Sequence, residues 1–309
     1  MTEEFKSPYT VMENRKYNTW CRYNARLDTY GRGCLHNCQY CYARHLLDFR
    51  GNWHPYSPAV ASRETILEAV SKIKPGAVVR LGGMTDCFQP IEGKHHMTLE
   101  AIKALNDRGV HYLITTKSAT CVFPEYLDAY DQSLAHFQIS ITATDDWKGN
   151  RIETASPESE RIRACETLFR MGFDTSVRLS PFIPEFVDTD VINAIECSKI
   201  LIEFLKVNPY VRRCLDLDYH EYTHKYGGHL NLELERKVEL AERLTDFDRR
   251  SVGEFVREHY LYFRDNYNSN PFDCCDLLGI AYETYPEVGE DDEDSWEQLS
   301  LEIEGGSNE

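Results

Sequence analysis

Long hydrophobic runs are missing from this chain of 309 residues. A helix that crosses a bilayer needs about 20 consecutive apolar residues, and no stretch approaches that length. Residues 1–6 also lack the apolar segment of a secretory signal. We therefore expect a soluble, cytoplasmic protein with no membrane partner.

The cysteine content does not indicate a disulfide framework. The chain has 11 cysteines, an odd number, and no sequence feature places it in an oxidising compartment. Internal repeats are not evident either. The thiols are therefore more available as metal ligands than as partners of one another.

Basic residues are absent from the C-terminal stretch 286–309, which holds ten acidic residues. Removing those ten charges from the formal net charge of -17 leaves -7 for the remainder of the chain. Such a segment repels itself, and we expect a disordered acidic tail. The overall charge balance argues against tight nonspecific binding to nucleic acid, because such binding depends on cations that neutralise phosphates. It does not exclude a local basic groove.

Three thiols stand together in one short segment. Cys34, Cys38 and Cys41 form a C-x3-C-x2-C spacing directly after a strand-like run. Three thiolates can hold three irons of a cubic 4Fe-4S cluster and leave the fourth iron open to a small chelating molecule. Structural zinc is the alternative, with His36 or His45 as the fourth ligand.

The spacing C-x3-C-x-aromatic-C resembles the cluster loop of the radical S-adenosylmethionine (radical SAM) enzymes. In that family the open iron chelates SAM, and an electron from a reductant such as flavodoxin or ferredoxin splits SAM into methionine and a 5'-deoxyadenosyl radical. The radical then removes a hydrogen atom from the substrate. The resemblance implies that Tyr40 lies against the adenine of SAM.

The rest of the chain alternates strand-like and helix-like stretches, which favours a parallel sheet with helices outside. Six such strand-helix units suit a partial (β/α)6 TIM-type barrel of the radical SAM kind. The expected strands are residues 27–30, 77–81, 110–115, 137–142, 174–179 and 214–217; the expected helices between them are 65–73, 99–106, 124–130, 157–171 and 190–205. We expect four regions: an irregular lead-in (1–27), the radical SAM core (28–226), a C-terminal helical appendage (227–285, with helices at 230–247 and 252–263) and the acidic tail (286–309).

Function in such barrels collects where strands end, so the residues that follow each strand are candidates. Gly82 and Gly83 allow backbone carbonyls to approach a ligand closely, and Thr85 follows in the same loop. Lys117 can bind an anion such as a carboxylate or phosphate, or it can be a solvated loop lysine. Ser140 and Thr142 carry hydroxyls suited to ribose. Arg178 stands on an inward strand position and needs a carboxylate, either Glu153 or that of SAM.

Taken together, several segments resemble the spore photoproduct lyase-like branch of the superfamily, over residues 28–188. They are residues 41–44, the segment formed by 85–86 and 89–92, and residues 116–118, 140–142, 151–153 and 181–184. The likeness implies a SAM site built from Tyr40, Gly82, Gly83, Ser140, Glu153 and Arg178.

The chain departs from that branch at the cysteine that returns a hydrogen atom to the product radical. The nearest thiol is Cys87, which is either a catalytic hydrogen donor that faces the substrate or a buried core residue. A second cluster, with Cys274 and Cys275 joining Cys214 or Cys21, is a weaker alternative because the usual four-thiolate spacing is missing.

We therefore predict a radical SAM enzyme whose substrate is a nucleobase or nucleotide in DNA. A peptide or partner protein is the second candidate substrate, and a metal-stabilised binding module without turnover is the alternative from another functional class. The oligomeric state is left open.

Overall fold

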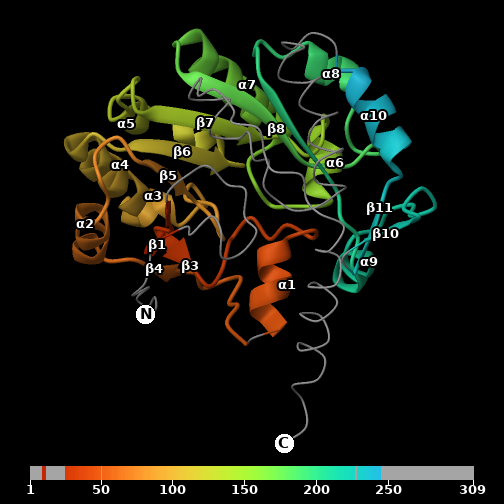
Figure 1. The fold of residues 1–309 in the computed structure, drawn as a ribbon, viewed down its shortest axis with the longest axis horizontal. Helices are drawn as coiled ribbons and strands as arrows, with labels where there is room; N and C mark the ends of the chain where they lie inside the picture. The colour runs from red at the N-terminus through yellow and green to blue at the C-terminus, as the bar shows by residue number, and fades with distance from the viewer. Residues whose placement is uncertain (1–8, 12–24, 50, 227, 245–309) are drawn as a thin grey trace, which may run out of the picture.

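The computed structural model describes residues 9–11, 25–49, 51–226 and 228–244. Six parallel strands form its main sheet in chain order: β2 (Ala25–Leu27), β5 (Val78–Leu81), β6 (His111–Thr116), β7 (Ala135–Ser140), β8 (Asp174–Phe182) and β9 (Ile200–Phe204). A seventh strand, β1 (Tyr9–Val11), pairs antiparallel with β2 at the edge. Sequential parallel strands joined by helical connections confirm the predicted partial barrel (Figure 1).

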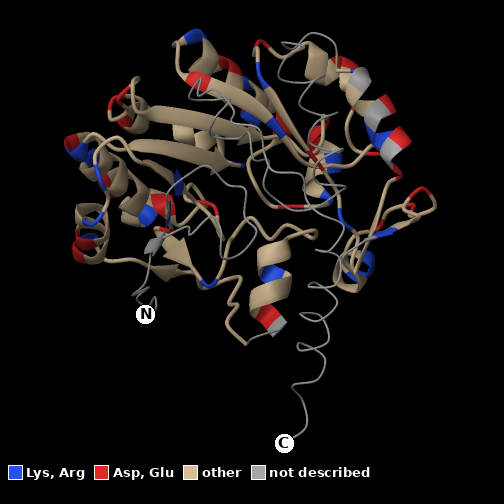
Figure 2. Ribbon diagram, viewed as in Figure 1, with Lys and Arg blue, Asp and Glu red and all other residues tan. Residues whose placement is uncertain are grey.

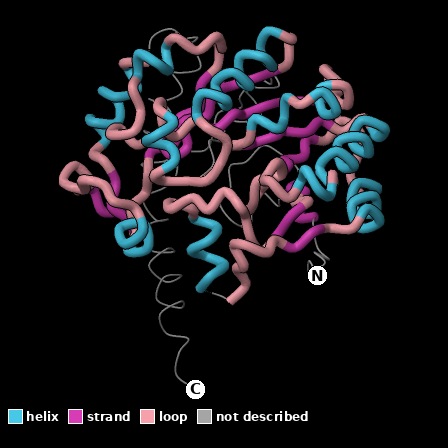
Figure 3. Tube along the Cα trace, turned by 180° about the vertical axis from the view of Figure 1, so that it is seen from behind, coloured by secondary structure: helices cyan, strands magenta, loops and turns pink. Residues whose placement is uncertain are grey.

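Helices cover the outer face of the sheet, as the view from behind shows (Figure 3). The longer ones are α2 (Arg63–Ser71), α4 (Met97–Arg108) and α7 (Glu158–Arg170). Ser62 caps α2 by accepting a hydrogen bond from the Thr65 amide, and Gly109 ends α4 in a left-handed conformation. Charged residues are frequent along these helices, whereas most residues of the strands are uncharged (Figure 2).

The other elements are short. They are β3 (Tyr30–Gly31), α1 (Tyr42–Phe49), β4 (Ala59–Val60), α3 (Glu92–His95), the 3-10 helix η1 (Ala119–Val122), α5 (Pro124–Leu127), α6 (Asp146–Asn150), α8 (Thr189–Asn193), α9 (Pro209–Cys214), β10 (His224–Tyr226), β11 (His229–Asn231) and α10 (Leu234–Glu242). In Figure 1, α1 and α9 lie on the open side of the barrel, away from the helices that cover the sheet.

The two faces of the sheet differ in polarity. Side chains alternate between faces along each strand, and the outer face carries the apolar core, including Leu81, Ile114 and Val177. The strand register places a polar series on the inner face, which the barrel encloses: Arg26, Arg80, Thr115, Gln138 and Arg178. The inner face is therefore the more polar of the two.

The prediction of the sixth strand was wrong. The strand is β9, within the stretch predicted to be a single helix over 190–205, and residues 209–214 form α9. The helix α8 ends at Asn193, and the run Ile200–Phe204 pairs in parallel with β8. A short apolar run fits either a buried strand or a helix, and tertiary pairing decides.

The ends of the predicted core also need correction. The lead-in is not wholly irregular, because β1 and β2 are strands, and the first barrel strand lies at 25–27 rather than 27–30. The hairpin β10–β11 straddles the expected boundary at 226/227, and the helix predicted for 230–247 is α10, over 234–242. The helix expected at 252–263 and the acidic tail lie outside the described residues. No helix among the described residues is long and apolar enough to cross a membrane.

Candidate active site

The three predicted cluster ligands lie in the loop between β3 and α1. Cys38 is buried, Cys34 and Cys41 are partly exposed, and all three are free thiols. Two successive turns shape the loop, in which the Asn37 amide donates to the Cys34 carbonyl and the Cys41 amide to the Cys38 carbonyl, each at 3.3 Å. Asn37 adopts a left-handed conformation (φ 47°), which asparagine tolerates better than most residues.

Hydrogen bonds fasten this loop to the strand-end loops of the barrel. The Leu35 amide donates to Gln89 Oε1 at 2.9 Å, in the loop that follows β5. The Gln39 amide donates to the Ile152 carbonyl at 2.9 Å, and the Thr154 amide donates to the His36 carbonyl at 2.7 Å. The thiol loop is thus held against the functional end of the sheet.

The donor set fits an iron-sulfur cluster. Burial raises the pKa of the Cys34 thiol to about 12, and burial also raises the pKa of Cys38 and Cys41. Thiols in such surroundings become thiolate ligands when a cationic metal centre compensates for the lost hydration. A cubane takes one thiolate per iron, so three ligands need not meet at a single ion.

Neither histidine stands in the position expected of a fourth zinc ligand. His36 Nε2 lies 3.3 Å from Asp86 Oδ2, and the His45 ring lies 5.3 Å from the ring of Tyr210. Among the described residues, no three Cys, His, Asp or Glu side chains form a group that could hold a single metal ion.

Three of the predicted site residues come together beside the thiol loop. The Tyr40 hydroxyl donates a hydrogen bond to the Glu153 carboxylate. Lys117 Nζ lies 3.7 Å from Glu153 Oε2 and 5.3 Å from the centre of the Tyr40 ring. Lys117 is therefore an ion-paired, largely buried residue and not a solvated loop lysine. Thr142 joins the group, with Oγ1 at 2.8 Å from Glu153 Oε1.

Two residues of this network were missed by sequence analysis. Arg161, on α7, is 1 % exposed and contacts both Glu153 and Glu158 at 2.5 Å. It also donates to the Ser140 carbonyl at 2.9 Å, which ties the predicted ribose-binding segment to the same cation. The signal was present in the sequence: Glu158 and Arg161 share the inward stripe of α7 with Ala164, Cys165 and Leu168.

The two carboxyl groups of the network have opposite pKa shifts. Burial raises the pKa of Glu158, and the negative charge of Glu153 adds to the rise. Burial also disfavours ionised Glu153, but Lys117, Arg161 and the hydrogen bonds from Tyr40 and Thr142 together hold its pKa below the ordinary value. Glu153 is thus the ionised member of the pair, and Glu158 is the member that keeps a proton.

This arrangement predicts a pH dependence of stability. The folded protein keeps a proton on Glu158 above the ordinary carboxyl pKa, so the free energy of unfolding falls as the pH rises from that value through the raised pKa. Glu158→Gln is expected to remove this fall, whereas Glu160→Gln, an exposed change on the same helix, is expected to leave it in place. Urea unfolding at several pH values measures the slope, and an unchanged slope in Glu158→Gln contradicts the assignment.

The two glycines after β5 form a tightly held turn. Gly82 has a φ of 77°, and a Cβ there would lie 2.9 Å from the Thr85 carbonyl. Asp28 Oδ1 accepts the Gly83 amide at 2.7 Å, and the Gly83 carbonyl accepts the Tyr42 hydroxyl at 2.9 Å. Thr85 is buried and donates to the Tyr30 carbonyl at 2.6 Å, so in this structure it braces the loop.

Arg178 has a partner that the sequence did not indicate. Its NH2 nitrogen lies 3.1 Å from Glu203 Oε2, and its NH1 nitrogen donates to Gln138 Oε1 at 2.7 Å. The structure thus pairs Arg178 with Glu203 and not with Glu153. The reason is the misplaced sixth strand, because β9 brings Glu203 beside β8. The carboxylate of SAM, the other partner that the sequence offered, stays a prediction.

Cys87 lies in the apolar core. It is 1 % exposed, and its carbonyl accepts a hydrogen bond from Thr98 at 2.6 Å. Burial raises the pKa of its thiol well above the ordinary value. Its role as a hydrogen donor stays a prediction.

Comparisons with known proteins agree with this geometry. The family model for the radical SAM superfamily matches residues 29–197. An uncharacterized protein of Methanocaldococcus jannaschii is 26% identical over 164 residues, which are 52% of this chain and 61% of that protein. An uncharacterized protein of Mycobacterium tuberculosis is 26% identical over 175 residues, 51% of this chain and 49% of that protein. The chain thus spans about half to three-fifths of the length of these relatives.

Two similar solved structures are of spore photoproduct lyase. One, complexed with dinucleoside spore photoproduct, has a TM-score of 0.58 and 17% sequence identity, covering 77% of this chain and 76% of that chain. Another, a variant with bound AdoMet and dinucleoside spore photoproduct, has a TM-score of 0.56 and 16% sequence identity. The match covers 80% of this chain and 85% of that chain. At this identity the likeness concerns the fold. The family match spans more than half of the chain and includes the thiol loop, so the chain belongs to the radical SAM superfamily, whose enzymes carry a 4Fe-4S cluster and S-adenosylmethionine.

Proposed function

We propose that this protein is a radical SAM enzyme that abstracts a hydrogen atom from a nucleobase or nucleotide in DNA, as a step of repair or modification. Cys34, Cys38 and Cys41 would hold the cluster. When bound and reduced, the cluster and SAM supply a 5'-deoxyadenosyl radical together with methionine. The electron donor would be a small protein such as flavodoxin or ferredoxin.

The proposal rests on one observation: the thiol loop is bonded directly to the network of buried polar residues around Glu153. The Gln39 amide bonds to the Ile152 carbonyl, and the next residue, Tyr40, bonds to Glu153. A metal ligand loop, an aromatic ring and an ionised carboxylate are thereby fixed in one place. This arrangement supports binding of a nucleoside-bearing ligand beside the cluster.

The chain's own residues would position that ligand and limit water. Lys117 and Arg161 keep Glu153 ionised, and Glu153 holds the phenol of Tyr40 so that its ring cannot rotate freely. Asp28 holds the amide of Gly83, which fixes the direction of the glycine turn. A network of buried, mutually bonded groups is rigid before the ligand arrives, which lowers the cost of ordering on binding.

The DNA part of the proposal rests on the likeness of fold to a lyase solved with a dinucleoside photoproduct. The lyase reaction itself is not included, because Cys87 lies in the core. The net charge of -17 predicts weak binding to undamaged duplex. A DNA affinity that falls steeply as salt rises would support the DNA substrate, because it reports cations that neutralise phosphates.

Anaerobic reconstitution with iron and sulfide tests the proposal. The reduced protein is expected to show the visible charge-transfer band of a cubane and to convert SAM into 5'-deoxyadenosine, measured by chromatography. A cubane that yields no 5'-deoxyadenosine would favour a binding module without turnover. Bound zinc in place of iron, in protein purified without oxygen, would overturn the proposal.

A further inference from the structure

A tryptophan stands exposed on the connection that leads from β7 to Glu153. Trp147 lies on α6 and keeps 68% of its surface exposed. Tryptophan is highly buried on average, because its large ring gains much from leaving water. An exposed apolar ring alone does not make a site, but a charged neighbour distinguishes this one.

Arg151 holds its guanidinium against the Trp147 ring. Its Cζ lies 5.2 Å from the centre of that ring and 6.0 Å from the centre of the buried Phe186 ring. The contact with Phe186 anchors the long side chain, so its charge stands beside Trp147 before any partner binds. The Arg151 side chain keeps 40% of its surface exposed. A flat ring and an accessible, ordered cation therefore stand together.

A second pair of this kind lies on the adjoining segment. The Cζ of the exposed Arg212 lies 5.8 Å from the centre of the Tyr219 ring, whose hydroxyl donates to the Leu215 carbonyl at 2.6 Å. Asp216 connects the two pairs, because its Oδ2 lies 3.7 Å from the Arg151 NH2 nitrogen. Burial raises the pKa of Tyr219, the charge of Arg212 opposes the rise and that of Asp216 adds to it. We call Trp147, Arg151, Arg212 and Tyr219 the rim platform.

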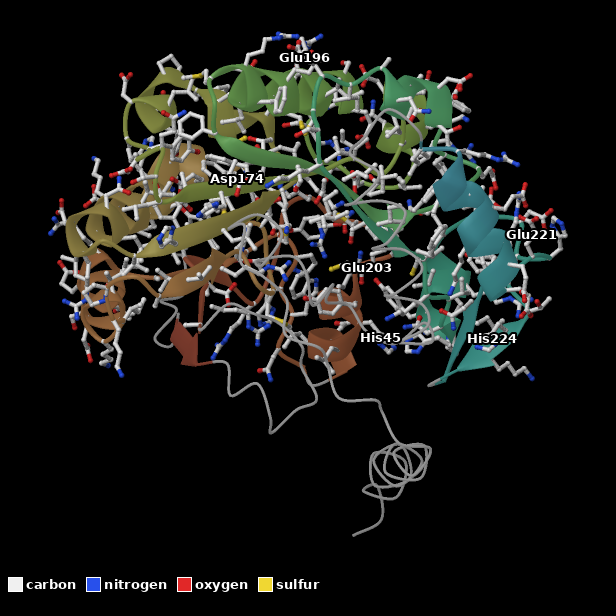
Figure 4. The ribbon with its side chains drawn as sticks, turned by 45° about the horizontal axis from the view of Figure 1, so that its top comes forward. His45, Asp174, Glu196, Glu203, Glu221 and His224 are labelled. Atoms are coloured by element: carbon white, nitrogen blue, oxygen red, sulfur yellow. The ribbon has the colours of Figure 1, made fainter. Side chains whose placement is uncertain are left out.

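The rim platform is fastened to the thiol loop. Gln39 Nε2 donates to the Arg151 carbonyl at 2.7 Å, and the Gln39 amide donates to the Ile152 carbonyl at 2.9 Å. On the other side, the Tyr210 ring of α9 lies 5.3 Å from the ring of His45 on α1, the helix that follows the thiols. His45 marks this open side of the barrel in Figure 4. A partner on the rim platform would thus lie beside the thiol loop.

The alternation of rings and cations fits a single nucleic acid strand. Bases and phosphates alternate along such a strand, and a base can stack on a side-chain ring only when its face is free of the duplex. A guanidinium binds phosphate oxygens well. Lys148 adds a cation next to Trp147 and is held there, since its Nζ donates to the Glu185 carbonyl at 3.0 Å. A protein partner would have to bury these charges, whereas a strand leaves its phosphates at the surface.

The carboxylate beside Arg151 does not block such a strand. The Asp216 side chain is fully exposed, so its pair with Arg151 is weak and a phosphate can replace it. Its charge still opposes a polyanion. Asp216 therefore limits the affinity of the rim platform without closing it.

We propose that the rim platform binds a single-stranded stretch of DNA next to the substrate nucleotide, with a base stacked on Trp147 and phosphates on Arg151 and Arg212. This inference rests on the proposed function, because it names how the substrate strand is held beside that same site. In this arrangement the strand must leave the duplex before it binds.

Fluorescence anisotropy of a labelled single-stranded oligothymidylate, with the reconstituted full chain, tests the stacking. We expect Trp147→Ala to weaken binding by about tenfold, and Trp147→Tyr, which keeps an aromatic face, to stay within about threefold of the unaltered protein. Phe123→Ala is the matched control and should change nothing. Phe123 is an exposed aromatic residue directly before α5, and α5 lies far from α6 in Figure 1.

Asp216→Asn is expected to strengthen oligothymidylate binding by at least about twofold, because it frees Arg151 and removes a charge that repels phosphate. Glu196→Gln makes the same change of charge elsewhere and should leave the affinity unchanged. Glu196 pairs with Arg170 at 2.6 Å and lies far from His45 in Figure 4. The comparison separates a local effect from that of the net charge, and it tests the inference even if Trp147→Ala does not fold.

Equal affinity of Trp147→Ala and the unaltered protein, or no gain in Asp216→Asn, would overturn the inference while the DNA substrate survives. If the unaltered protein binds no oligothymidylate, the DNA part of the proposed function fails as well. Binding of an acidic peptide in its place would assign the rim platform to a protein partner and overturn the inference. Formation of 5'-deoxyadenosine in the same preparation reports separately on the radical chemistry.

Discussion

Cys38→Ala is expected to abolish both cluster assembly and the formation of 5'-deoxyadenosine. Cys38 is the most buried thiol of the loop, and we expect the chain not to retain a cubane that has only two protein ligands. Iron and sulfide analysis, the visible spectrum and chromatography of the SAM products measure the effect. The folded barrel should persist, because the loop is fastened by the backbone and side-chain bonds of its other residues.

Cys214→Ser is the matched control for this experiment. Cys214 is a free, partly exposed thiol at the end of α9, outside the thiol loop. We expect the iron content and SAM cleavage of this variant to equal those of the unaltered protein. Loss of half the iron in Cys214→Ser would instead support the second cluster that the sequence left open.

Arg161→Met is expected to lower the free energy of unfolding by about 3–5 kcal/mol, because it leaves the ionised Glu153 buried with one cation fewer. The substituted side chain fills similar space, so the loss is electrostatic and not a cavity effect. Urea unfolding of the apoprotein at neutral pH measures it. SAM binding by the reconstituted variant should also weaken, since Arg161 holds the Ser140 carbonyl as well.

Arg170→Met provides the comparison on the same helix. Arg170 is exposed and pairs with Glu166 and Glu196 at the surface, so its loss should leave the free energy of unfolding nearly unchanged. Equal destabilisation by the two arginine variants would contradict the buried network.

The thiol loop and the strand-end residues could be predicted because their signals are local. The spacing of Cys34, Cys38 and Cys41 lies within eight residues, and the parallel alternation brings Tyr40, Lys117 and Glu153 to one end of the sheet. Glycine at 82 is likewise a local signal, because its positive φ and the close Thr85 carbonyl exclude larger residues.

The rest depended on tertiary pairing. Ile200–Phe204 suits a helix or a buried strand, and only its pairing with β8 makes it β9 and brings Glu203 to Arg178. Gln138 stands in a strand where burial of a polar amide has no sequence signature. Arg161 stands on the inward stripe of α7, but its partner could not be predicted, because only the folded connection after β7 places Glu153 against it.

Electron paramagnetic resonance of the reduced protein, with SAM labelled by nitrogen-15 at its amino group, tests the central claim most directly. An iron without a protein ligand predicts that adding SAM changes the cluster spectrum and that a nuclear coupling from the labelled nitrogen appears. A spectrum that stays the same after saturating SAM, with no such coupling, would contradict the account.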